Sequence, residues 1–140
     1  MTMRHILRAA ATVTAACAVA VAAIALRMAP GRVVKWATAR SDAGARASLP
    51  ATSSKASPAL AHAVALFGAR VHATCLQQGV ALVMLFAVAR LPGRLVIGVA
   101  PGDSILRAHA WVESGGRAIL GAAEAAGYHR FPVAASACRS

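Results

Sequence analysis

The chain opens with a long apolar stretch. Residues 9–26, AAATVTAACAVAVAAIAL, contain no charge and follow Arg4 and Arg8. This pattern predicts a helix, and it fits a signal-peptide core, a short membrane span or a helix packed on its own domain. Because ten of the 18 residues are alanine, burial of this helix in a bilayer would be only weakly favourable. We therefore favour the packed helix and keep export or membrane anchoring as the alternative.

A polar segment separates this beginning from the rest of the chain. Residues 31–40 (GRVVKWATAR) predict a short second helix, and residues 41–58 (SDAGARASLPATSSKASP) are small and polar, as in a linker. At the end of this linker, Ser57-Pro58 predicts the N-cap and the first helical residue of a further helix. We divide the chain into an N-terminal apolar helical region (1–40), a linker (41–58) and a compact domain (59–140).

The most informative segment of the compact domain is TCLQQGVALVMLFAVAR, residues 74–90. Thr74 and Gln77 stand three apart before an apolar run, which is the pattern of a capping box. Cys75 is then the first residue of the helix. Residues 80–89 are apolar on every side of this helix, so we expect it to be buried at the centre of the domain.

The pattern then changes from helices to strands. Residues 95–99 (LVIGV) predict a strand buried on both faces, and Gly115-Gly116 predicts a hairpin loop before a returning strand that begins at residues 118–120. Between them, residues 107–113 (RAHAWVE) predict a second strand. Strand alternation places the side chains of His109, Trp111 and Glu113 on one face of it. Helices followed by a small antiparallel sheet predict an α+β fold.

Charge and cysteine content narrow the possible functions. The 140 residues suit one domain, and 15 basic residues against four acidic ones give a net charge of +11. However, the chain has few aromatic residues, no Lys/Arg run and no zinc or RNA-binding signature, so we do not expect a nucleic-acid partner. The cysteines Cys17, Cys75 and Cys138 are too few and too scattered for a disulfide framework. This favours a reducing compartment, and we predict neither a cofactor nor a metal ion.

Cys75 and His109 are the candidates for chemistry. The positive end of a helix dipole favours the thiolate form of a cysteine placed there. A nucleophilic thiol also needs a base, and a histidine on a sheet packed against the helix is the usual solution in thiol peptidases. The alternative is that Cys75 is a small packing residue and His109 a structural histidine.

Three segments strengthen the catalytic interpretation. TCLQQGVAL (74–82), LVIGV (95–99) and AHAWVE (108–113), followed by Gly116, resemble the transglutaminase-like domain of lasso peptide maturation B proteins, over about residues 60–131. This resemblance implies a papain/transglutaminase-like fold in which the buried helix that carries the cysteine packs on the sheet. It also implies that Cys75 is the nucleophile and His109 the base of a peptidase that removes the leader of a microcin-type lasso precursor.

The resemblance also implies partners and a location. Longer family members carry a leader-binding domain ahead of the peptidase, and this chain lacks the length for one. The expected partners are therefore the lasso precursor peptide, a separate leader-recognition protein and an ATP-dependent lasso cyclase. A looser likeness at the N-terminus implies a cytoplasmic protein that retains its apolar helix, with association with the membrane through residues 9–26 as the alternative.

One position departs from the pattern of that family. The commoner sequence has an acid 12 residues after the histidine, and here that position is Gly121. If the hairpin is centred on Gly115-Gly116, His109 lies opposite Ala122, and Glu124 is its diagonal neighbour, within reach of a long side chain. We therefore predict that Glu124 orients His109, the alternative being an exposed glutamate near the strand end. An acid restored by Gly121→Asp should substitute for Glu124, provided that residue 121 needs no positive φ angle.

The neighbouring polar residues receive smaller roles. Trp111 and Glu113 are predicted to be structural or to lie at the rim of the site, and Gln77 is assigned to the helix cap. The backbone N–H of Cys75 is a free donor that can contact an oxyanion, and the role of Gln78 is left open. Two other functions remain: a non-catalytic transglutaminase-like binding module, and a small membrane-anchored protein in which Cys75 only packs.

Overall fold

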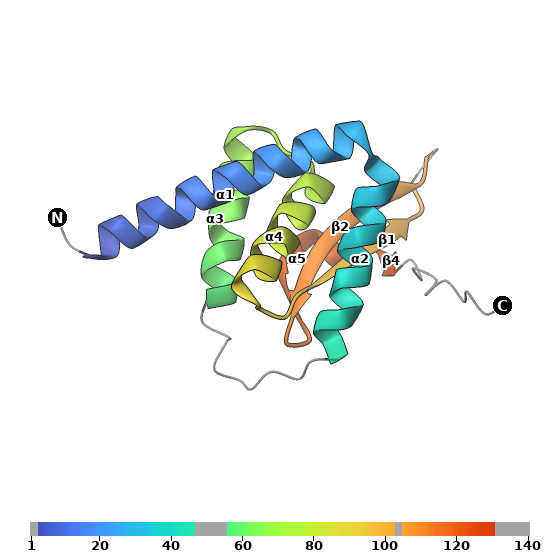
Figure 1. Ribbon diagram of the computed structural model, residues 1–140. Coiled ribbons are helices and arrows are strands. Elements are labelled where there is room, and N and C mark those ends of the chain that lie inside the picture. The colour runs from blue at the N-terminus through green and yellow to red at the C-terminus, as the bar shows by residue number, and fades with distance from the viewer. Residues whose placement is uncertain (1–2, 47–55, 103–104, 131–140) are drawn as a thin grey trace.

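The computed structural model describes residues 3–46, 56–102 and 105–130 (Figure 1). Within these ranges the chain forms five helices and a four-stranded sheet, the α+β class expected from the sequence. The elements in chain order are α1 (Met3–Met28), α2 (Pro30–Arg46), α3 (Ala56–Arg70), α4 (Cys75–Ala89), β1 (Arg94–Ala100), β2 (Arg107–Ser114), β3 (Arg117–Leu120), α5 (Ala122–Ala125) and β4 (His129–Arg130).

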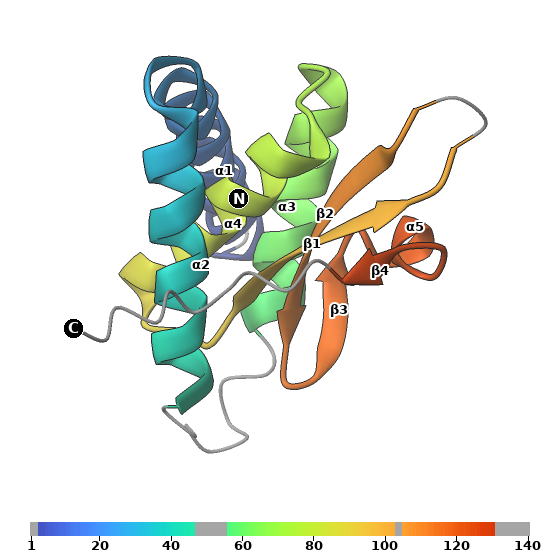
Figure 2. The same cartoon turned by 90° about the vertical axis from the view of Figure 1, so that its right-hand side faces the viewer.

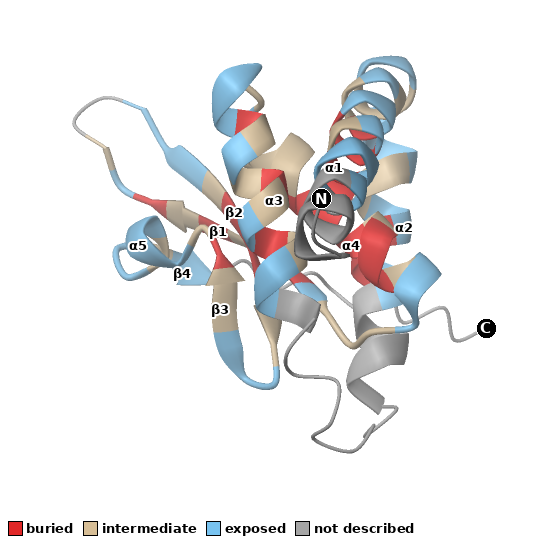
Figure 3. Ribbon diagram, turned by 90° about the vertical axis from the view of Figure 1, so that its left-hand side faces the viewer, coloured by how far each residue is buried: buried red, intermediate tan, exposed pale blue. Residues whose placement is uncertain are grey.

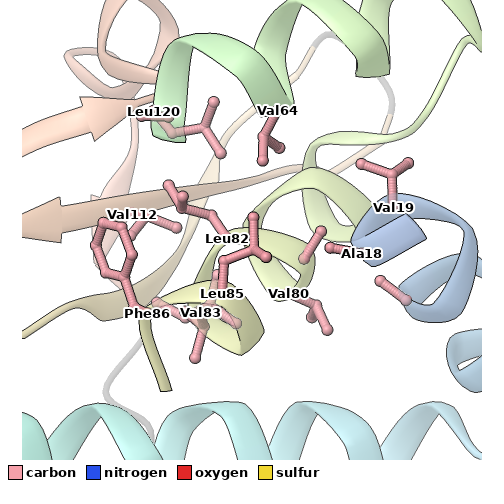
Figure 4. Packing of buried hydrophobic residues seen from close by; sticks show 14 of the residues in the cluster. Ala18, Val19, Val64, Val80, Leu82, Val83, Leu85, Phe86, Val112 and Leu120 are labelled. Atoms are coloured by element: carbon pink, nitrogen blue, oxygen red, sulfur yellow. The ribbon is translucent and has the colours of Figure 1, made fainter. Parts of the chain in front are cut away.

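Helix α4 lies at the centre of the molecule, as its all-round apolar sequence predicts. Its middle is buried from Gly79 to Val83 and again at Leu85 and Phe86. It packs against α1, α3 and β2, and Figure 4 shows labelled side chains from each of these elements around it, such as Val19, Val64 and Val112. Because the helix that begins at Cys75 is held on several sides, the position of Cys75 relative to the sheet is fixed.

Helix α1 packs on its own domain, the arrangement that the sequence favoured. Figure 1 shows it lying across α3 and α4. Among the α1 residues whose burial is described, the buried side chains recur at the spacing of one helix face, and three of the four are alanines, which let the helices approach closely: Ala15, Ala18, Val19 and Ala22. The other face of α1 is exposed (Figure 3). None of the helices in the described ranges is both long enough and apolar enough to cross a membrane.

The polar segment between residues 41 and 58 is flanked by helices that reach into it. Helix α2 extends to Arg46, beyond the short helix expected over 31–40, and residues 47–55 lie outside the described residues. Helix α3 begins at Ala56, so the prediction that Ser57 caps it and Pro58 opens it is wrong. Pro58 is instead the third helical residue, which is allowed because the first backbone N–H groups of a helix have no acceptor within it.

The sheet is antiparallel with the strand order β3-β2-β1-β4 (Figure 2). Strand β1 covers the predicted 95–99, and its pairing with β2 places Gly98 opposite His109. The predicted hairpin loop is confirmed, since Gly115 and Gly116 have φ angles of 59° and 77°. Such positive values at both positions are typical of a two-residue hairpin loop.

The far end of this hairpin differs from the predicted register. Glu113 pairs with Ala118 as expected, but Val112 pairs with Leu120, so the register shifts by one residue. A β-bulge of this kind bends a strand and interrupts its pairing. Strand β3 then ends at Leu120 and the chain enters α5, so the prediction that His109 lies opposite Ala122 is wrong.

The two faces of β2 have different surroundings. Ala110 and Val112 belong to the core. This face of β2 packs closely on α4, since a Cβ atom added to Gly79 of α4 would lie 3.7 Å from Val112. The other face carries His109, Trp111 and Glu113, as predicted from strand alternation. Trp111 lies over β1, where a Cβ at Gly98 would come within 2.7 Å of its ring. The absence of a side chain at Gly98 therefore lets the indole lie flat against the sheet.

Candidate active site

Cys75 is the first residue of α4, and its position is set by the predicted capping box. Thr74 is extended, its backbone N–H donates to Gln77 Oε1 over 2.9 Å, and the Gln77 N–H donates to Thr74 Oγ1 over 3.3 Å. The thiol of Cys75 is free and partly buried. The local sequence therefore fixes a cysteine at the positive end of a buried helix.

The first turn of α4 also keeps backbone donors available. The Gln78 N–H donates to the Thr74 carbonyl over 3.0 Å, and the capping box uses the N–H groups of Thr74 and Gln77. The N–H groups of Cys75 and Leu76 have no acceptor within the described residues. Free donors at this end of a helix favour negative charge placed beside them.

His109 is held from three directions. Its side chain is 12% exposed. The ring stacks on Trp111 with centroids 6.1 Å apart, and Tyr128 lies at 5.3 Å in a tilted orientation. The third contact is a hydrogen bond of 3.2 Å between Nε2 and the Gly121 carbonyl oxygen. Because a carbonyl only accepts, it favours the tautomer in which Nε2 carries the proton and Nδ1 is free to act as a base.

A polar network supports the stacked ring. The Trp111 Nε1–H donates to Glu113 Oε1 over 3.0 Å, and Arg130 donates to both oxygens of Glu113, at 3.2 and 2.7 Å. Glu113 is only 13% exposed, and two-pronged pairing of this kind is a strong, directional contact. Since Arg130 belongs to β4, the network ties the last described strand to the strand that carries His109. Trp111 and Glu113 thus have the structural role that the sequence predicted.

Tyr128 and Arg130 were missed by the sequence analysis. Tyr128 contacts His109 because the short strand β4 pairs with β1, where Arg130 stands opposite Gly98. The Tyr128 hydroxyl also accepts a long hydrogen bond, 3.4 Å, from Arg107. The only signal for these contacts is an isolated tyrosine late in the chain, and no local pattern links it to a histidine 19 residues earlier.

Cys75 and His109 line the same pocket. Its volume is about 250 Å³, and α3, α4, β2 and the turn into α5 contribute to it. The thiol and the imidazole share no hydrogen bond in the described part of the chain. Catalytic hydrogen bonds in free enzymes are often long and tighten when substrate binds. The complete lining is Ala65, Cys75, Gln78, His109, Ala110, Leu120, Gly121 and Glu124.

Glu124 reaches His109 by a different route from the predicted one. It lies on α5 rather than on an extended hairpin, and its Oε2 is 4.0 Å from His109 Nε2. Its side chain is 63% exposed, so water and salt screen this pair. The closer acceptor for Nε2 is the Gly121 carbonyl.

The proposed Gly121→Asp substitution required that residue 121 have no positive φ angle, and the structure does not meet this requirement. Its φ angle is 71°, in the left-handed region that side chains rarely adopt. A Cβ atom there would lie 3.0 Å from His109 Nε2 and 3.2 Å from Trp111 Cβ. Gly121→Asp would strain the turn and crowd the imidazole, so we withdraw the expectation that it substitutes for Glu124.

These features define a class of protein: an α+β domain in which a cysteine at the start of a buried helix shares a pocket with a histidine on an antiparallel sheet. A family model described as the transglutaminase-like superfamily matches residues 14–135. The chain therefore belongs to the transglutaminase-like superfamily. Comparisons with curated proteins and with solved structures gave no match. Within the described residues no group of three or more His, Cys, Asp or Glu side chains is placed to hold a metal ion.

Proposed function

We propose that this protein is a thiol peptidase that removes the leader from a lasso peptide precursor before cyclisation. The observation that carries the proposal is the shared pocket, in which Cys75 at a capped helix start and a His109 ring with a fixed orientation meet. Membership of the transglutaminase-like superfamily supports it, because cysteine peptidase-type enzymes are common there. The narrower assignment to lasso precursors depends on the likeness of residues 74–82, 95–99 and 108–113 to the maturation B proteins.

In the proposed acylation step, His109 Nδ1 takes the proton of Cys75 and the thiolate attacks the carbonyl carbon of the scissile bond. A C–S bond forms while the carbonyl electron pair moves onto oxygen. The free N–H of Cys75 is placed to donate to that oxyanion. The C–N bond then breaks, and the imidazolium gives its proton to the departing amine, which is the new N-terminus of the core peptide.

In deacylation, His109 takes a proton from water as the water oxygen attacks the thioester that links the leader to Cys75. The C–S bond breaks, the leader departs with a free carboxyl group, and the proton returns to the thiolate. The core peptide now has a free amine, which an ATP-dependent cyclase needs as its substrate. We therefore propose the precursor, a separate leader-recognition protein and a cyclase as partners, and the cytoplasm, where the precursor is synthesised, as the location of the reaction.

Thiol labelling combined with a cleavage assay tests the proposal. We expect iodoacetamide near neutral pH to alkylate Cys75 faster than Cys17, although Cys17 is the more exposed thiol. We also expect mass spectrometry to show separate leader and core peptides after incubation with the precursor and leader-recognition protein encoded in neighbouring reading frames. An inert Cys75 together with an intact precursor would contradict the peptidase assignment.

The same assay addresses the second candidate, a non-catalytic module that binds the precursor. The glycine at position 121, where the commoner pattern of the lasso maturation B proteins has an acid, is the observation that favours it. Binding of the precursor without cleavage, in the presence of the recognition protein, would support this module over the peptidase. Because the Gly121 carbonyl already accepts from His109 Nε2, the catalytic assignment does not require an acid at that position.

Glu124→Gln should lower the single-turnover cleavage rate about two- to fivefold, since an exposed ion pair contributes little. Precursor binding should be nearly unchanged, because Glu124 is proposed to orient His109 and orientation acts mainly in the transition state. The difference from wild type should shrink at high salt, which screens the pair. A rate equal to wild type at low salt would leave Cys75 and His109 as a dyad, and Glu124 would lose its proposed role.

A further inference from the structure

Gln78 is the polar side chain in the pocket that the proposed mechanism does not use. It stands three residues after Cys75 on α4, is partly buried, and lines the pocket together with Cys75 and His109. Gln77 is committed to the helix cap and does not line this pocket. The two adjacent glutamines therefore have different surroundings.

The carboxamide of Gln78 is held in one orientation. Its Nε2–H donates to the Ala73 carbonyl over 2.8 Å, which ties it to the turn between α3 and α4. Ala73 is in turn fixed by its own N–H, which donates to the Gly68 carbonyl over 2.9 Å. An amide nitrogen carries two hydrogens, so the Ala73 carbonyl takes one N–H of Gln78 and leaves the second available as a donor.

Helix α3 leaves room for this carboxamide. A Cβ atom at Gly68 would lie 2.5 Å from Gln78 Cδ and 2.9 Å from Nε2. Gly68 lies in the last turn of α3, two residues before the helix ends at Arg70. Any side chain at this position would have to displace the carboxamide of Gln78.

We propose that Gln78 is a catalytic residue whose free Nε2–H donates to the oxyanion alongside the backbone N–H of Cys75. The inference rests on the proposed thiol peptidase function. When the thiolate attacks, the carbonyl π pair becomes a lone pair on oxygen, and this negative charge accepts both hydrogen bonds until the C–N bond breaks. A donor fixed before the reaction stabilises this charge without reorganisation at that moment, which is why such donors affect the rate strongly.

The test measures kcat and KM for cleavage of the precursor with saturating leader-recognition protein, and the rate at which iodoacetamide alkylates Cys75. Alkylation forms no oxyanion, so it reports on the thiol alone. Gln78→Ala and Gln78→Met, which remove the donor without adding a charge, should lower kcat about 10²- to 10³-fold with KM and the alkylation rate nearly unchanged. Gly68→Ala should lower kcat by displacing an intact Gln78. Gly31→Ala is the matched control, because a Cβ at Gly31 meets nothing within 4 Å.

Two results would overturn the role of Gln78 alone: cleavage by Gln78→Ala within threefold of wild type, or a loss of alkylation that parallels the loss of kcat. The second result would mean that Gln78 only shapes the surroundings of the thiol. If wild-type protein does not cleave the precursor, the proposed function fails and the role of Gln78 fails with it. If Gln78→Ala were unstable, the glycine variants would still decide. A lower kcat for Gly68→Ala, with an unchanged kcat for Gly31→Ala, would support the proposal that the reaction depends on the position of the Gln78 carboxamide.

Discussion

Replacing Cys75 by alanine should abolish leader removal and leave the fold intact. The substitution removes the only group in the pocket proposed to form a covalent bond with the substrate, so the acyl-enzyme route is lost and no cleaved precursor should be detected. The helix start should survive, because the cap depends on Thr74 and Gln77 rather than on the thiol. Alanine is also the best helix-forming residue.

Mass spectrometry of the precursor after a long incubation gives the measurement, with the thermal unfolding midpoint as the check on folding. Cys17→Ala is the matched control, since it removes an exposed thiol from α1 and should cleave at the wild-type rate. Undiminished cleavage by Cys75→Ala would show that another group performs the chemistry.

His109→Gln should have the second largest effect, a fall in the cleavage rate of about 10²- to 10⁴-fold. Glutamine can still donate a hydrogen bond, but it cannot take the proton of Cys75 and return it to the departing amine. In contrast to the Gln78 variants, the alkylation rate of Cys75 should fall as well, because the imidazole is proposed to activate the thiol itself.

The rate of this variant must be compared well below its unfolding temperature, because the ring also packs on Trp111 and Tyr128. His62→Gln on α3 is the matched control, since His62 is exposed and does not line the pocket. If Cys75 of His109→Gln is alkylated, and the precursor is cleaved, at the wild-type rates, His109 is a structural histidine and another residue must act as the base.

The part of the site that could be predicted from the sequence is the part built by local interactions. Thr74 and Gln77 are three residues apart, so their mutual hydrogen bonds depend only on the helix that they begin, and this placed Cys75 at the first position. Gly115-Gly116 similarly identified the hairpin loop, because positive φ angles at both positions favour glycine. Strand alternation then gave the face that carries His109.

The register beyond the hairpin could not be predicted in the same way. Ala118, Ile119 and Leu120 are all apolar, so a slip of one residue leaves the hydrophobic pattern almost unchanged. The bulge therefore left no signal in the sequence, and the glycine at position 121 permitted the left-handed turn without predicting it. Glu124 approaches His109 through this turn, whereas the prediction relied on a diagonal pair across a regular ladder.

The N-terminal stretch shows a second limit of pattern analysis. An alanine-rich helix without charges is compatible with a signal-peptide core and with a packed helix, since alanine is moderately apolar and small in both settings. What decides between the two is whether the rest of the domain offers a surface for the helix. Helices α3 and α4 provide this surface for α1, whose Ala15, Ala18 and Ala22 are buried. Those surfaces come from residues more than 30 positions further along the chain.

Strand β4 links the end of the described chain to the orientation of the imidazole. It is only two residues long and pairs with Gly98 and Val99, so a strand of this length depends on the contact between Arg130 and Glu113 to stay attached. Short elements with few contacts open in a local unfolding equilibrium that leaves the rest of the fold intact. Tyr128 directly precedes β4 and is also held by its own N–H, which donates to the Ala125 carbonyl over 3.2 Å. We therefore expect opening of β4 to loosen the contact between Tyr128 and His109, and this contact to be strongest in the fraction of molecules in which β4 is paired. Any ligand or protein that binds only the paired form would raise that fraction by mass action, without touching the pocket itself.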